Sequence, residues 1–203
     1  ATEHAFIDRA LATMAGGDRI PEVAETYGRI ASVARRQRSA LDHRFALLLS
    51  GWVEAGSSGD AVLPIDRVMS KIVAPVARTA PVLLLVVDGL SCAILQELGE
   101  DLATRGWIAM QPAGDSARAD VYLALAMIPS VTEWSRASLL TGKRVQGGQS
   151  VEKAGFASHP ALLEASRPKK PPRLFHKADL DDGRNGLDEA LREALLAPEQ
   201  QVV

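Results

Sequence analysis

The feature that most constrains the fold is an unbroken apolar run at residues 82–87, VLLLVV, which is followed directly by Asp88 and Gly89. A strand that is exposed on one face alternates apolar and polar residues, whereas this run is apolar at every position. The run is also too short for a free-standing helix. It therefore predicts a central strand of a parallel sheet that is covered on both faces.

Strand-like and helical patterns alternate after this run. Ser91 can cap the next helix, residues 107–110 and 121–128 have the composition of further strands, and a helix is expected over residues 133–140. This alternation favours an α/β fold with a doubly wound, mostly parallel sheet.

The residues before the apolar run have helical periodicity. Apolar side chains recur at helical spacing over residues 5–14 and again from Pro21 to Trp52, and a further helix is expected to follow Pro64 and to end near Pro75. We therefore divide the chain into a helical segment, residues 1–78, and an α/β domain, residues 79–203.

Two stretches are expected to be mostly loop. One is the Gly/Ser segment at residues 56–59, and the other begins at Gly142, where glycines and prolines punctuate a polar stretch. A helical stripe returns at residues 187–195, and another apolar segment begins at Val202, so we expect the α/β domain to be incomplete at its C-terminus.

Charge and cysteine content limit the class of protein. The formal net charge is −2, so no global basic field is expected to hold nucleic acid. The single cysteine, Cys92, excludes an internal disulfide and fits a reducing compartment such as the cytoplasm. The longest apolar runs fall far short of the roughly 20 residues that cross a bilayer, so no membrane span is expected.

A local basic cluster at Arg35, Arg36 and Arg38 has two interpretations. The three side chains belong to a predicted helix and suit either binding of nucleic-acid phosphates or the solvated face of that helix, which is the more common arrangement.

Asp88 is the first candidate site residue. In open α/β sheets ligands bind at the carboxyl ends of the strands, and Asp88 follows the predicted central strand there. Its carboxylate suits a divalent metal ion, while Gly89 allows a sharp turn beside it. An aspartate before a glycine is equally typical of a plain turn.

Thr132 and Arg136 are the second candidate site. The hydroxyl of Thr132 is expected at a helix N-terminus, where free amides and the helix dipole favour an anion, and Arg136 lies one turn further on the same face. The alternative is a capping threonine followed by an exposed arginine, which is the commoner arrangement.

Three segments resemble one known family. PSVTEWSRASLLTGK, residues 129–143, is similar to the nucleophile loop of the alkaline phosphatase superfamily. Together with VVDGLS at residues 86–91 and LFHKADL at residues 174–180, it resembles the PglZ proteins of BREX phage-resistance systems. The similarity covers roughly residues 62–196. Sulfatases of the superfamily need cysteine or serine at the nucleophile position, so the threonine disfavours that branch.

The resemblance implies a metal-dependent phosphatase or phosphodiesterase of a cytoplasmic phage-defence complex. Thr132 matches the nucleophile and a metal ligand, Asp88 matches the first metal ligand, and Arg136 matches an arginine near the bound anion. Two divalent ions, zinc in the first place, would be held with ligands expected beyond Val203, so this chain alone is expected to be inactive. The substrate would be a phosphoester, with DNA or a nucleotide as one option.

Two further functions stay open, a non-catalytic scaffold of the same defence complex and a DNA-binding module. Three aspartates, Asp179, Asp181 and Asp182, follow the LFHK segment and are interpreted as a solvated turn. Two histidines, His159 and His176, are isolated in the sequence, and lone histidines are usually structural or exposed.

Overall fold

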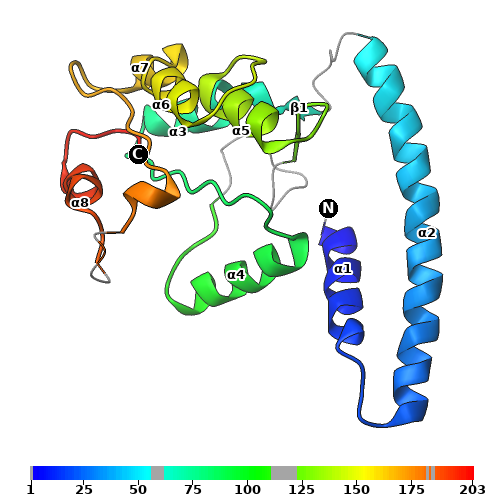
Figure 1. Cartoon of the computed structure of the whole chain (residues 1–203). Coiled ribbons are helices and arrows are strands. Elements are labelled where there is room, and N and C mark those ends of the chain that lie inside the picture. The colour runs from blue at the N-terminus through cyan, green and yellow to red at the C-terminus, as the bar shows by residue number, and fades with distance from the viewer. Residues whose placement is uncertain (1, 56–61, 111–122, 182, 184–185) are drawn as a thin grey trace. The chain divides into compact units, whose positions relative to one another are not determined.

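The computed structural model of the chain describes residues 2–55, 62–110, 123–181, 183 and 186–203 (Figure 1). The chain forms two compact units that interleave along the sequence. The first comprises residues 1–58 and 87–122, and the second residues 59–86 and 123–203. The division expected at residue 78 falls inside the second unit. Each unit is described by itself.

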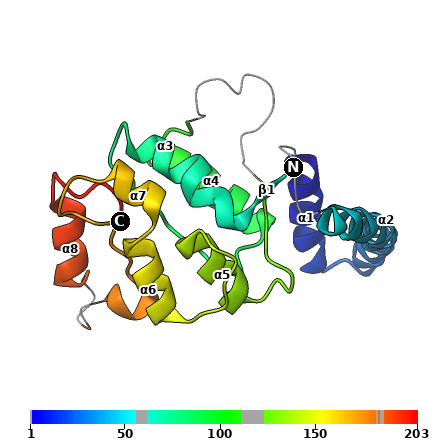
Figure 2. The same cartoon turned by 90° about the horizontal axis from the view of Figure 1, so that it is seen from above.

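Among the described residues, the regular elements of the first unit are all helices, and two of them lie in the segment predicted to be helical. It contains α1 (Thr2–Ala15), α2 (Pro21–Glu54) and α4 (Cys92–Thr104), and α1 contacts both of the other helices. Helices α1 and α2 run antiparallel side by side (Figures 1 and 2). The predicted cap of α4 is confirmed, because the Ser91 hydroxyl accepts a hydrogen bond from the Ile94 amide at 3.3 Å.

The three arginines of the α2 cluster have different surroundings within their own unit. Arg38 pairs with Asp8 of α1 at 3.1 Å and with Asp42 at 3.5 Å, and Arg36 donates a hydrogen bond to Ser32 at 2.8 Å. Arg35 is exposed. One of the three cations is therefore paired with two carboxylates.

The second unit combines short helices with a minimal sheet. In chain order its elements are β1 (Leu63–Pro64), the 3-10 helix η1 (Ile65–Arg67), the π-helix η2 (Met69–Val73), α3 (Ala74–Ala77), β2 (Ala124–Leu125), α5 (Thr132–Thr141), α6 (Gln149–Ala157), α7 (Pro160–Ala165), the 3-10 helix η3 (Lys177–Asp179) and α8 (Glu189–Leu196). The strands β1 and β2 are parallel, with Leu63 opposite Ala124 and Pro64 opposite Leu125. The predicted helices over residues 133–140 and 187–195 are confirmed as α5 and α8.

The core of the second unit lies where η2, α3, α5, α6 and α7 meet. Its buried apolar residues are Met69, Val73, Ala74, Ala77, Leu140, Phe156, Leu162 and Val202. Helix α5 packs on both α6 and η1, so its orientation is set by contacts along two sides.

The central strand predicted at residues 82–87 is wrong. Only Val82 forms a bridge, parallel to Val202, and the ladder ends with the Leu84 amide donating to the Val203 carbonyl at 2.8 Å. Val82 and Leu84 pack on the core, whereas Leu85 is 75 % exposed and Val87 is 58 % exposed. The run therefore pairs along a short stretch of one edge and is covered on one face. The described part of the chain is mostly helical with a small parallel sheet, so it combines helices and strands as predicted, and no doubly wound sheet is seen among the described residues.

The other strand predictions fare differently. Residues 107–110 form no strand, and Trp107, Ile108 and Met110 are exposed. Of the stretch 121–128, residues 121–122 lie outside the described residues, and Ala124–Leu125 forms a strand much shorter than predicted. This strand is parallel, as expected, but its partner Leu63–Pro64 was not predicted to be a strand. The loop expected at residues 56–59 also lies outside the described residues.

Two helical predictions need correction in their extent. The helix after Pro64 continues past Pro75 to Ala77. In a regular α-helix the ring of Pro75 would clash with the carbonyl one turn earlier. The π-type turn at residues 69–73 widens the backbone hydrogen-bond spacing just before the proline and avoids this clash. The stretch after Gly142 contains α6 and α7 where loop was expected, because Gly148 and Pro160 stand at the starts of these helices.

Candidate functional site

Helix α5 carries the predicted nucleophile at its first residue. Val131 has extended backbone angles and precedes the helix, and Thr132 is exposed at its start. The first amides of a helix have no partner within it, so this end is an electropositive place for an anion. Thr132 and Arg136 are four residues apart and lie on the same side of α5, as predicted.

The residues of the SRASLLTG motif that follow Arg136 serve mainly packing. Ala137, Ser138, Leu140 and Thr141 are buried, and the Ser138 hydroxyl accepts a hydrogen bond from the Val145 amide at 3.1 Å. Gly142 ends the helix in the left-handed conformation, with φ of 66°. The hydrogen bond to Val145 holds the following loop against α5. Most of the motif therefore fixes the position of the helix that carries Thr132 at its first residue.

Arg136 is hydrogen-bonded to the buried carboxylate of Glu152. Its Nε donates a hydrogen bond to Oε1 of Glu152 on α6 at 2.9 Å, and the Glu152 side chain is 0 % exposed while that of Arg136 is 32 % exposed. A guanidinium bound through Nε retains the edge formed by Nη1 and Nη2, which can bind two oxygens of an anion.

His176 of the LFHKADL segment completes this cluster. Its Nε2 lies 2.7 Å from Oε2 of Glu152. One oxygen of this buried carboxylate therefore contacts the nucleophile-loop segment, residues 129–143, and the other contacts the LFHKADL segment. The Nε2 atom donates this hydrogen bond when it carries the ring proton. The histidine interpreted as isolated in the sequence is thus an internal partner of Glu152.

Asp179 anchors the same segment and forms part of a pocket wall. Its Oδ2 accepts a hydrogen bond from the His176 amide at 2.9 Å and pairs with Nζ of Lys153 at 2.7 Å. The hydrogen bond from Lys153 and then that from the His176 amide lower the pKa of Asp179. Asp179 lies in a turn and is partly exposed, as interpreted from the sequence, and its side chain in addition links η3 to α6.

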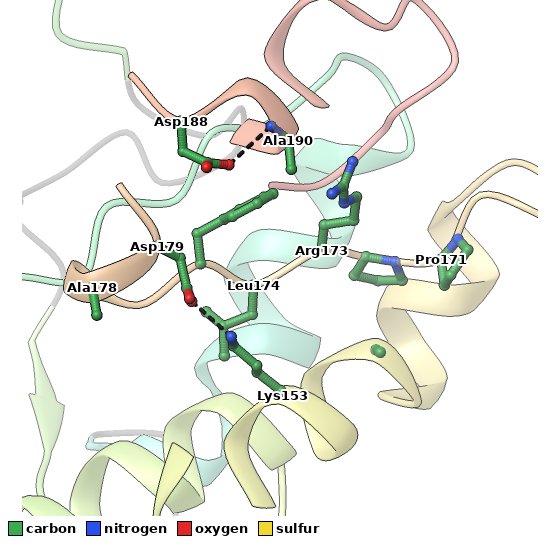
Figure 3. Close-up of a pocket in the computed structure, with 11 residues that line it drawn as sticks. Lys153, Pro171, Arg173, Leu174, Ala178, Asp179, Asp188 and Ala190 are labelled. Carbon is green, nitrogen blue, oxygen red and sulfur yellow. Dashed lines mark hydrogen bonds and ion pairs between the residues drawn. The ribbon is translucent and has the colours of Figure 1, made fainter. Parts of the chain in front are cut away.

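The pocket beside this ion pair has a volume of about 550 Å³. Figure 3 shows the Lys153 ammonium directed at Asp179 and the Asp188 carboxylate directed at the Ala190 amide. Arg173 stacks over the Phe175 ring at 4.9 Å. The remaining lining residues are small or apolar: Ala157, Pro171, Pro172, Leu174 and Ala178. The charges along this wall are matched by partners, so the pocket is not an electropositive site.

Asp88 belongs to the first unit, whereas Thr132 and Arg136 belong to the second. Asp88 is exposed and forms a turn with Gly89, whose φ is 75°. That Asp88 lies close to Thr132 stays a prediction. Among the described residues, no group of three or more His, Cys, Asp or Glu side chains is arranged to hold a metal ion.

Sequence reasoning found Thr132 and Arg136 but missed Glu152. The signal available was weak: Glu152 is a lone acid on what proves to be the inner face of a nine-residue helix, among residues expected to be loop. Recognition of α6 would have shown that Glu152 and the buried Phe156, four residues apart, share one helical face.

In the part of the chain that the structure describes, no helix has the length and apolar character that a membrane span requires. No family model, curated protein or solved structure matches the chain.

Proposed function

We propose that this chain supplies the nucleophile and the anion clamp of a metal-dependent phosphoester hydrolase of the PglZ kind. The observation that carries the proposal is the arrangement on α5: Thr132 is exposed at the first residue of the helix, and Arg136, one turn on, is fixed by a buried carboxylate. The similarity of three segments to PglZ proteins supports the same reading. It is also the basis for proposing a role in a phage-defence complex.

The chemistry of the chain's own residues follows from this arrangement. Oγ of Thr132 would attack phosphorus in line, the bond from phosphorus to the leaving oxygen would break, and the hydroxyl proton would be lost to solvent or the leaving group. The positive end of the α5 helix dipole and the Nη edge of Arg136 would stabilise the charge on the nonbridging oxygens. Water would then cleave the phosphothreonine and regenerate Thr132.

Asp88 and Thr132 offer oxygen donors of the kind that divalent cations prefer. A zinc site needs about three protein ligands, so these two residues would hold such an ion only together with further ligands. Bound ions would supply activation of the hydroxyl and neutralisation of phosphoryl charge.

The test is hydrolysis of a bis-aryl phosphate by the full-length protein, with Zn²⁺ or Mn²⁺ added. We expect Thr132→Ala to abolish turnover, whereas Thr132→Ser retains part of it because a hydroxyl remains. Thr104→Ala on α4, which removes an exposed threonine that bonds only its own helix backbone, is the matched control. Equal rates for wild type and Thr132→Ala would refute the proposal.

A non-catalytic scaffold of a defence complex is the second candidate function. The observation in its favour is that much of the SRASLLTG segment serves packing, since Ala137, Ser138 and Thr141 are buried. A scaffold predicts that Thr132→Ala leaves copurification with the partner proteins unchanged and that no phosphoester is hydrolysed.

A further inference from the structure

The structure joins two sequence motifs through a residue that belongs to neither. We propose that His176 of the LFHKADL segment, acting through Glu152, is a positioning residue for Arg136 of the nucleophile-loop segment. The positioning itself is a property of the described contacts, and its catalytic consequence rests on the proposed function.

Glu152 needs both of its partners. Its side chain is 0 % exposed, Oε1 accepts from Arg136 at 2.9 Å, and Oε2 lies 2.7 Å from Nε2 of His176. A buried carboxylate without hydrogen-bonding partners is strongly unfavourable, and removal of one partner typically destabilises a protein because the other charge stays buried. The carboxylate is therefore pinned between two elements and has little freedom to rotate.

A pinned carboxylate transmits this restraint to Arg136. A guanidinium is planar, so a hydrogen bond at Nε together with the covalent attachment of the side chain sets the direction in which Nη1 and Nη2 point. The Arg136 side chain is partly exposed, and its Nε is hydrogen-bonded to Glu152. Nη1 and Nη2 can therefore bind an anion while the Nε contact holds the guanidinium in place. A clamp that is ordered before the anion arrives loses less conformational entropy on binding.

His176 is itself held in place by its own segment. Its amide donates a hydrogen bond to Oδ2 of Asp179 at 2.9 Å, and the same oxygen is paired with Nζ of Lys153 at 2.7 Å. These contacts tie the start of η3 to α6. Asp179 therefore fixes the backbone at His176, His176 orients the Glu152 carboxylate, and Glu152 orients the Arg136 guanidinium.

The first experiment measures the restraint directly on this chain, without any activity. The NMR signal of the Arg136 Nε–H group should show slow exchange with water and a high heteronuclear NOE, unlike that of the exposed Arg35. We expect both features to be lost in His176→Leu and retained in His176→Gln, whose amide can donate from a position similar to Nε2. An Arg136 signal that is the same in His176→Leu as in wild type would overturn the proposal.

The second experiment measures the catalytic consequence in the hydrolysis assay described above. His176→Leu should raise KM about tenfold with a smaller change in kcat, and His176→Gln should recover most of the loss; a coupling of about 1.4 kcal/mol corresponds to this tenfold effect. In an Arg136→Ala background His176→Leu should have little further effect, because the two residues act as one unit. Lys177→Ala, an exposed neighbour, is the control.

The outcomes separate the two ideas. Additive effects of His176→Leu and Arg136→Ala would refute positioning even if hydrolysis depends on Thr132. If hydrolysis is absent or insensitive to Thr132→Ala, the proposed function fails, and the NMR result alone decides whether His176 positions Arg136. Melting curves of every variant show whether a loss reflects unfolding.

Discussion

At the scale of single residues, Gly142 has neither the backbone conformation nor the space that a side chain needs. Its φ of 66° favours glycine, and a Cβ at this position would lie 2.3 Å from Nε2 of the buried His159. We expect Gly142→Ala to lower the free energy of unfolding by about 2 to 4 kcal/mol, because backbone strain and overpacking add. Urea denaturation measures this.

Gly183 provides the matched control for that prediction. It has a φ of 74°, and nothing lies within 4 Å of the place where its Cβ would be. Gly183→Ala should therefore cost only the strain, roughly 1 kcal/mol. Equal losses for the two variants would show that the contact with His159 contributes nothing.

His159 makes the stability of the second unit sensitive to acid. The side chain is 4 % exposed, and burial lowers its pKa. The folded chain therefore binds the proton less readily than the unfolded chain, so this contribution to stability is present above the unfolded pKa, about 6.5, and is lost as the pH falls below it. We expect the Tm of wild type to fall more between pH 7.5 and pH 5.5 than that of His159→Gln. Parallel pH profiles would contradict this account.

At the scale of elements, α8 depends on its cap. Asp188 Oδ1 accepts hydrogen bonds from the Ala190 amide at 2.9 Å and the Leu191 amide at 3.4 Å. We expect Asp188→Ala to destabilise the chain by about 1 kcal/mol, the usual value for loss of an N-cap. Glu193→Ala, on the exposed side of the same helix, should change stability much less, and urea denaturation of both variants compares them.

Helices with clear ends were predictable, whereas the sheet was not. Pro21, Ser91 and Gly142 mark ends of α2, α4 and α5, and local chemistry alone determines such ends. A strand depends instead on a partner that is distant in sequence, and the apolar run at residues 82–87 finds one over only a short stretch near Val202. An apolar run therefore predicts burial only where the pairing partners exist.

The same distinction holds for the candidate site. Thr132 and Arg136 were predictable because their relation is four residues along one helix. The partners of Glu152 lie 16 and 24 residues away in sequence and meet only after α5, α6 and the segment before η3 have packed. Neither periodicity nor a short motif carries this information.

At the scale of the whole molecule, the two units differ in how much apolar surface they bury. In the described part of the first unit, the buried apolar residues are Ala31 and Ala93, whereas the second unit has a continuous core around Met69, Phe156 and Leu162. Helix α2 leaves large apolar side chains exposed, among them Phe45, Leu47 and Leu48. Burial of an apolar face supplies most of the stability of a helix in a protein. Helix α2 buries little of its apolar surface, so its backbone hydrogen bonds have little protection from local opening.

Hydrogen exchange should therefore separate the units. Amides that open only when a cooperative core unfolds exchange slowly, while those of elements with little burial exchange through local opening. We expect the amides of α5 and α6 to exchange at least about tenfold more slowly than those near Phe45 in α2, a difference that corresponds to about 1.4 kcal/mol in opening free energy. Mass spectrometry of peptides from both helices measures this. Protection in α2 equal to that in α5 would mean that its apolar face is covered in solution.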